Sequence, residues 1–247
     1  MNALADWFDT ARALKRELTG QAAVGLTQDE VDAFNAIVTK WAVHATAPAN
    51  PTALTDAGAF FNSVRSSFGP LSQPQVNGFQ TLLQAFGIAS WPLAFVAYGL
   101  ATAWRETAKT MQPVKEAYWF SEDWRRRNLK YFPWYGRGYV QLTWKGDDRP
   151  SLYGYARADR DLGLAGALLA DPDKALEPDI AAMIITRGMA EGWFANKRLA
   201  DYLPARGAAT EQQFEQAREI VNGTDAAPEI ARNALKFQDA LSAGGWA

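Results

Sequence analysis

The sequence predicts a predominantly helical protein of the α+β class, with a small antiparallel β-hairpin or sheet. Residues 93–104 are almost entirely apolar, and a helix that is apolar on all sides is a buried helix. Capping boxes, in which Thr or Ser precedes Glu or Gln by three residues, indicate helix starts at residues 27–30, 72–75 and 210–213. Residues 131–144 interrupt the helical pattern with aromatic residues and glycines, and we expect the sheet there.

The N-terminal part of the chain contains a duplication. Residues 8–41 and 61–86 share a pattern of apolar and helix-capping residues, and each copy is predicted to form a helical hairpin. The segment 45–52, rich in Ala, Pro, Asn and Thr, is the predicted linker between them. We therefore expect an N-terminal helical extension over residues 1–52 and a main domain over residues 53–247.

The composition excludes several kinds of chemistry. A net charge of −2 over 247 residues argues against nucleic acid as the main partner. The chain has no cysteine, its single histidine (His44) cannot form a His-rich metal site, and no carboxylates cluster at the spacing of a calcium loop. We therefore expect no metal, no other cofactor and no Ser–His or Cys–His catalysis. Carboxylates remain as the candidate catalytic groups.

The N-terminal residues bear on localisation. Residues 1–18 form an amphipathic pattern that acidic residues interrupt, so this stretch is neither a signal peptide nor a membrane span. We expect a monomer that is made in the cytoplasm and has no stable membrane insertion.

Glu106 follows the apolar helix and is the first candidate catalytic residue. Stepping back from it by helical spacing reaches small and aromatic residues, so we expect a partly buried carboxyl whose pKa is raised. A carboxyl that stays protonated near neutral pH is what a general acid for glycoside cleavage requires. The alternative is an ordinary ion pair with Arg105 or Lys109 at a helix end.

The region after this helix is unusually aromatic. Aromatic walls with a few fixed polar groups make orienting pockets for sugars, and Arg137 between Gly136 and Gly138 offers a planar set of donors. The alternative is a small aromatic core around a β-hairpin. The aromatic residues of this region are Tyr118, Trp119, Phe120, Trp124, Tyr131, Phe132, Trp134, Tyr135, Tyr139 and Trp144.

Two segments resemble motifs of family 19 glycoside hydrolases. The segment Ala103-Trp104-Arg105-Glu106-Thr107 is similar to the family's His-Glu-Thr/Ser segment, and 136–144 is similar to its Gly-Arg-Gly-x-x-Gln-Leu-Thr/Ser-aromatic signature. Residues 111–116, 171–194 and 220–224 resemble the phage and prophage endolysin branch, and the resemblance covers about residues 56–243. It implies a lysozyme-like fold and hydrolysis of β-1,4 bonds in peptidoglycan. Arg105 stands where the family usually has His, which puts the role of that position in doubt.

The resemblance also assigns roles to particular residues. Glu106 is the implied acid, and an inverting enzyme needs a second carboxylate that activates water across the sugar. Glu116 is the favoured base, while Glu122, beside the charged run 125–127, is the other candidate and is more typical of a solvated loop. Thr143 would position the attacking water, or else is simply a β-branched strand residue.

The expected substrate-binding residues come from the same signature and from one later segment. Asn222 is expected to bind the glycan, although it equally fits a helix stop before Gly223. The complete expected set of substrate-binding residues is Arg137, Gln141, Tyr139, Trp144 and Asn222.

Three functional alternatives follow. The favoured one is an endolysin that leaves the bacterial cytoplasm by a holin or another route and then lyses the cell wall. The second is the same chemistry on chitin, and the third is a non-catalytic glycan-binding or virion structural protein. The extension at 1–52 is either a packed addition or an appendage that binds the wall or a partner.

Overall fold

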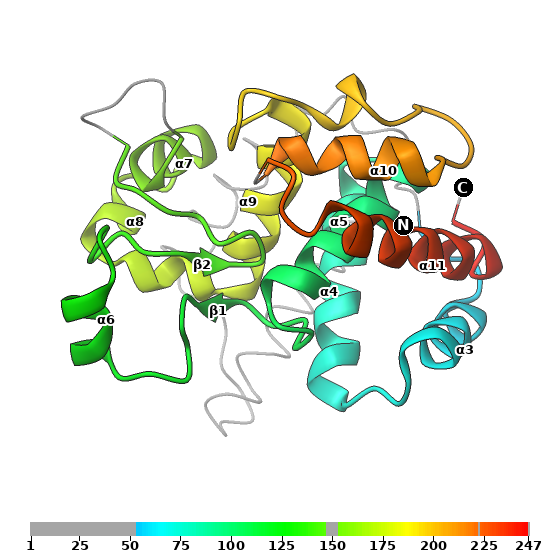
Figure 1. Ribbon diagram of the computed structural model, residues 1–247, viewed down its shortest axis with the longest axis horizontal. Coiled ribbons are helices and arrows are strands. Elements are labelled where there is room, and N and C mark those ends of the chain that lie inside the picture. The colour runs from blue at the N-terminus through cyan, green and yellow to red at the C-terminus, as the bar shows by residue number, and fades with distance from the viewer. Residues whose placement is uncertain (1–52, 147–152, 222, 247) are drawn as a thin grey trace, which may run out of the picture. The chain divides into compact units, whose positions relative to one another are not determined.

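The computed structural model describes residues 53–146, 153–221 and 223–246. The predicted N-terminal extension with its hairpin, linker and first capping box, and the candidate Asn222, lie outside the described residues. Within them the chain is mostly helical with a two-stranded antiparallel sheet, as the sequence predicts (Figure 1). The α-helices are α3 (Ala57–Phe68), α4 (Gln73–Ile88), α5 (Leu93–Glu106), α6 (Glu122–Asn128), α7 (Tyr155–Leu162), α8 (Ala167–Ala170), α9 (Pro178–Glu191), α10 (Glu211–Ala217) and α11 (Ala227–Ala243). The shorter elements are the strands β1 (Val114–Lys115) and β2 (Arg137–Gly138) and the 3₁₀ helices η1 (Pro172–Leu176), η2 (Leu199–Asp201) and η3 (Arg218–Ile220).

The capping boxes predicted within the described residues are confirmed. At the start of α4, the Ser72 hydroxyl accepts a hydrogen bond from the Gln75 amide, and the Gln75 side chain accepts one from the Ser72 amide. Thr210 and Gln213 make the same reciprocal pair before α10. Each pair satisfies two backbone donors that a helix start otherwise leaves without partners. Helices α3 and α4 occupy the residues of the second predicted hairpin, and the rings of Phe60 and Phe61 contact that of Phe79.

The hydrophobic core is built around α5. As predicted, most of this helix is buried, and it packs against α11, which also contacts α3 and α10. Trp104 near its end meets Phe79 and Phe237 with ring-centroid distances of 6.1 Å each, and Phe68 at 5.0 Å. Each fully buried side chain of this size contributes roughly 1.5–3 kcal/mol to stability. The end of α5 is thus held in a rigid aromatic cluster.

The sheet differs from the expected one because one of its two strands lies outside residues 131–144. The sequence places both strands within residues 131–144, but β2 pairs with β1, in the register Val114 with Gly138 and Lys115 with Arg137. Within the expected segment only an isolated bridge joins Arg137 to Leu142. Gly138 has φ +86°, and the chain turns back there too tightly for a second regular strand.

In Figure 1 the strands are drawn to the left of α4 and α5, with α6, α7 and α8 further to the left and α3, α10 and α11 to the right; strand β2 contacts η1 and α9. Among the described residues no helix is both long and apolar enough to cross a membrane.

Candidate active site

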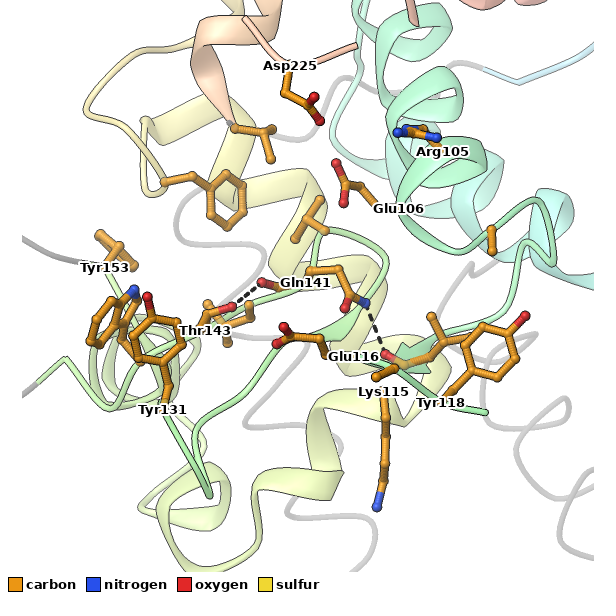
Figure 2. Close-up of a pocket in the computed structure, with 18 of the residues that line it drawn as sticks. Arg105, Glu106, Lys115, Glu116, Tyr118, Tyr131, Gln141, Thr143, Tyr153 and Asp225 are labelled. Carbon is orange, nitrogen blue, oxygen red and sulfur yellow. Dashed lines mark hydrogen bonds between the residues drawn. The ribbon is translucent and has the colours of Figure 1, made fainter. Parts of the chain in front are cut away.

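A cleft with a volume of about 590 Å³ opens where the end of α5 faces the sheet and the segment after α10 (Figure 2). This volume is within the range of small-molecule sites. The lining residues are Arg105, Glu106, Ala108, residues 114–119, Tyr131, residues 140–144, Tyr153, Phe194, Arg218, Val221 and Asp225.

Glu106 reaches the cleft because α5 ends at this residue. The next residue, Thr107, is fully buried, and its hydroxyl donates to the Ala103 carbonyl at 2.7 Å while accepting from the Met111 amide at 3.1 Å. The threonine of the Glu-Thr motif therefore closes the helix and fixes the loop that leaves it. This loop is fastened to α4 as well, since Gln75 Nε2 donates to the Lys109 carbonyl at 2.9 Å.

The carboxyl of Glu106 forms a salt bridge with Arg218. Nη2 of Arg218 lies 2.9 Å from Oε1 of Glu106, and the two side chains are 1% and 17% exposed. This ion pair differs from the expected alternative: Lys109 is not the partner, and Arg105 lies 3.8 Å from Glu229 at the exposed rim. Among the described residues no hydrogen bond to Oε2 of Glu106 is formed, so this oxygen is available on the cleft side.

Glu116 lies directly after β1 and faces the same cleft. Its backbone amide donates to the Gly136 carbonyl at 2.7 Å, and the Gly136 amide donates to Oε2 of its carboxylate at 2.9 Å. Figure 2 places Glu106 and Glu116 on opposite sides of the pocket, with Gln141 between them. Each of the two carboxylates thus has one oxygen fixed by a protein donor.

Glu122 lies outside the cleft lining. The Tyr135 hydroxyl donates to its carboxylate at 3.0 Å, and Arg125 Nη1 lies 3.5 Å away. Burial, followed by the presence of Glu122, raises the pKa of Tyr135 to about 12, although Arg137 opposes the shift. The prediction of a loop is wrong, because Glu122–Asn128 form helix α6, and the prediction of solvation is wrong for Arg125, which is 5% exposed and whose Nε donates to the Glu116 carbonyl at 3.2 Å.

Five residues of the predicted glycine-rich signature, 140–144, line the cleft, and they include the expected site residues Gln141, Thr143 and Trp144. Thr143 donates from its hydroxyl to the Gln141 carbonyl at 2.7 Å. Nε2 of Gln141 donates to the carbonyls of Val114 and Gly138 at 3.1 and 3.2 Å, so this amide braces the cleft wall. Gln141 and Trp144 have φ of +55° and +72°, which is rare for residues with side chains and costs about 1–3 kcal/mol each. Such strain concentrates at functional sites.

Two other expected sugar-binding residues lie away from the cleft. Arg137 is 3% exposed and contacts Asp173 at 2.8 Å, and its Nη1 donates to the hydroxyl of Tyr155 at 3.0 Å and to the carbonyls of Pro133 and Tyr135. Tyr139 is 1% exposed, and burial raises the pKa of its hydroxyl. Because both side chains point into the protein, they support the cleft wall and do not reach a ligand within it.

Arg218 and Asp225, which were not among the predicted site residues, join the site from the segment that contains the candidate Asn222. Nε of Arg218 donates to the Asp225 carbonyl at 2.8 Å, and Figure 2 shows the Asp225 side chain on the same side of the pocket as Glu106. Residues 220–224 of this segment resemble the endolysin branch, but no feature of the sequence singles out Arg218 or Asp225.

Among the described residues no group of three or more His, Cys, Asp or Glu side chains is placed to hold a metal ion. Comparisons of the chain with protein-family models, with curated proteins and with solved structures find no match.

Proposed function

We propose that the protein hydrolyses β-1,4 glycosidic bonds in the glycan strands of peptidoglycan. The observation that carries this proposal is the pair of carboxylates, Glu106 and Glu116, on opposite sides of one cleft (Figure 2). Two carboxylates flanking a scissile bond are the usual apparatus of glycoside hydrolysis. Strained backbone at Gln141 and Trp144 on the same wall adds support.

The roles of the two carboxylates follow from an inverting mechanism. Glu106 gives a proton to the leaving glycosidic oxygen through Oε2, while Arg218 holds Oε1. Glu116 accepts a proton from a water molecule, whose oxygen attacks the anomeric carbon from the opposite face of the sugar. Thr143, whose hydroxyl bonds the Gln141 carbonyl, is the candidate that positions this water.

The substrate class and the fold family rest on the sequence resemblance. The helical architecture with a small sheet agrees with the lysozyme-like fold of family 19 glycoside hydrolases, to which the Glu-Thr and Gly-Arg-Gly segments point. The endolysin-like segments favour peptidoglycan over chitin, and with them a role in host lysis after release from the bacterial cytoplasm. Hydrolysis of chitin by the same groups is the nearest alternative.

A second candidate function is glycan binding without catalysis. The observation that favours it is the ion pair between Glu106 and Arg218, since a general acid must have a proton to give. Arg105 in place of the family's His points in the same direction.

Release of reducing ends from purified peptidoglycan and from chitin tests the proposal. We expect the wild-type protein to release reducing ends from peptidoglycan, and the variant Glu106→Gln to lose this activity by about 10²–10⁴-fold. The matched control is Glu177→Gln, which changes an exposed carboxylate outside the cleft that pairs with Lys174. Full activity of Glu106→Gln would overturn the assignment, whereas binding without any hydrolysis by the wild type would favour the second candidate.

A further inference from the structure

Three consecutive aromatic side chains are exposed on the loop that follows Glu116. The residues Tyr118, Trp119 and Phe120 are 45%, 67% and 42% exposed. Among the described residues, Leu169 is the one other large hydrophobic residue that is exposed to a similar degree. Elsewhere in the described chain large apolar side chains are at least partly covered. A cluster of exposed apolar side chains marks a binding surface.

The loop presents these rings on a fixed support. The ring of Phe120 stacks on Trp124 at 4.1 Å with an angle of 13°, while Tyr118 and Trp119 meet edge to face at 5.0 Å. The buried guanidinium of Arg125 joins both ends of the loop, because it donates to the Phe120 carbonyl at 2.7 Å and to the Glu116 carbonyl at 3.2 Å. Because the rings are already held in place, they lose little further conformational entropy when a ligand binds.

The exposed surface continues into the cleft. Tyr118 and Trp119 line the cleft, and Phe120 does not. Figure 2 shows Tyr118 at one end of the pocket and Tyr131 and Tyr153 at the other end, with the two carboxylates between them. A linear ligand that crosses the carboxylates therefore meets an aromatic side chain at each end.

We propose that Trp119, together with Tyr118, is a stacking platform for sugar rings of a long glycan strand, beyond the sugars that contact Glu106 and Glu116. This inference rests on the proposed function, since it takes the occupant of the cleft to be a glycan. The flat apolar face of an indole suits the C–H face of a pyranose ring. The platform makes affinity depend on strand length.

Binding is tested in the Glu106→Gln background, so that the ligand stays intact. Calorimetry compares a peptidoglycan disaccharide with long soluble glycan strands. We expect Trp119→Ala to weaken binding of the long strands about tenfold, which is about 1.4 kcal/mol, and to change binding of the disaccharide little. Trp119→Phe, which keeps a planar ring, restores most of the affinity. Leu169→Ala is the matched control, because it removes an exposed apolar side chain outside the cleft and leaves both affinities unchanged.

Three results would overturn the platform. One is equal affinity of Trp119→Ala and its parent for long strands, and another is an equal loss for both ligand lengths, as a general structural effect would give. The third is a loss of binding to phosphatidylglycerol vesicles in Trp119→Ala with glycan binding intact, which would assign the rings to a lipid surface.

Hydrolysis by the wild type and glycan binding by the Glu106→Gln parent fail independently if only one of the two proposals is wrong. If the parent protein binds long strands through Trp119 and the wild type hydrolyses none, hydrolysis is wrong and the platform stands. If the parent binds no glycan of either length, both the platform and the proposed function are wrong.

Discussion

Arg218 and Glu106 are 112 positions apart in the chain and form a 2.9 Å salt bridge in the wall of the cleft. The same guanidinium donates through Nε to the Asp225 carbonyl at 2.8 Å, while its Nη1 is buried without a hydrogen-bond partner among the described residues. Arg218 therefore connects the end of α5 to the segment before α11. Removing one member of a buried ion pair leaves the other charge uncompensated.

We expect Arg218→Met to reduce both stability and activity. Loss of the guanidinium leaves the Glu106 carboxylate unpaired, which should lower the free energy of unfolding by roughly 3–5 kcal/mol. Urea denaturation measures the first effect and reducing-end release the second. Arg218→Lys keeps a positive charge but cannot bond Glu106 and Asp225 with one planar group. Its activity should therefore lie between that of the wild type and that of Arg218→Met. Wild-type stability and activity in Arg218→Met would show that the bridge supports neither.

The two candidates for the second carboxylate can be separated by one pair of variants. Glu116→Gln should lower hydrolysis by about 10²–10⁴-fold, because Glu116 faces the cleft and an amide cannot accept the proton of water. Glu122→Gln should keep activity near the wild-type level, because Glu122 bonds Tyr135 outside the cleft lining. Initial rates of reducing-end release measure both. The reverse ranking would make Glu122 the base.

Features set by near neighbours in the chain could be predicted from the sequence. The capping box at Ser72 and the burial of α5 depend on residues within a few positions of each other, and both are confirmed. The signature also has glycine where a side chain would be strained or crowded, since Gly138 has φ +86° and a Cβ on Gly136 would lie 2.8 Å from Gln141 Oε1. A local pattern carries this information without knowledge of the tertiary structure.

Features set by distant partners could not be predicted. Strand β1 has two residues, which is too short for any alternation, so its pairing with β2 leaves no trace in the sequence. Arg137 looks like a surface or ligand-binding residue in a linear sequence. Its burial depends on acceptors such as Asp173, 36 positions away, that only the folded chain brings close. The partner of Glu106 is more distant still.

Gly136→Ala should impair the site more than the fold. A Cβ at this position would lie 2.8 Å from Gln141 Oε1 and 3.3 Å from Glu116 Oε2, so the new methyl group displaces two cleft side chains. Both atoms are ends of side chains that can move, and we expect activity to fall at least about tenfold with a loss of stability near 1 kcal/mol.

Gly78→Ala is the control for Gly136→Ala, because it introduces the same methyl group at a crowded position outside the cleft lining. There a Cβ would lie 1.7 Å from the Met111 carbonyl oxygen, a backbone atom that cannot rotate away. We expect a loss of roughly 1–3 kcal/mol from this overpacking, measured by urea denaturation. If Gly136→Ala proved the less stable variant with intact activity, the tight contact at Glu116 would have no role in catalysis.

The contribution of Asp173 to stability should depend on pH in a defined direction. Partial burial alone would raise the pKa of its carboxyl, but hydrogen bonds from Lys115 at 2.6 Å and from Arg137 at 2.8 Å lower that pKa below its ordinary value. A carboxyl whose pKa is lower in the folded than in the unfolded protein stabilises the fold at pH values above the unfolded pKa, about 3.9. This stabilisation declines as the pH falls from there through the folded pKa.

The variant Asp173→Asn isolates this effect. Its free energy of unfolding, measured in urea between neutral pH and about pH 3, should lie below that of the wild type at neutral pH. The difference in free energy of unfolding between the two proteins should then shrink as the solution becomes more acidic. Protonation removes the negative charge of Asp173 from the wild type, and the substitution has already removed it from the variant. The side chain of Asp173 is 45% exposed, so solvent screens the pair and the difference is modest. A difference that stays constant across this pH range would mean that Asp173 acts through packing alone.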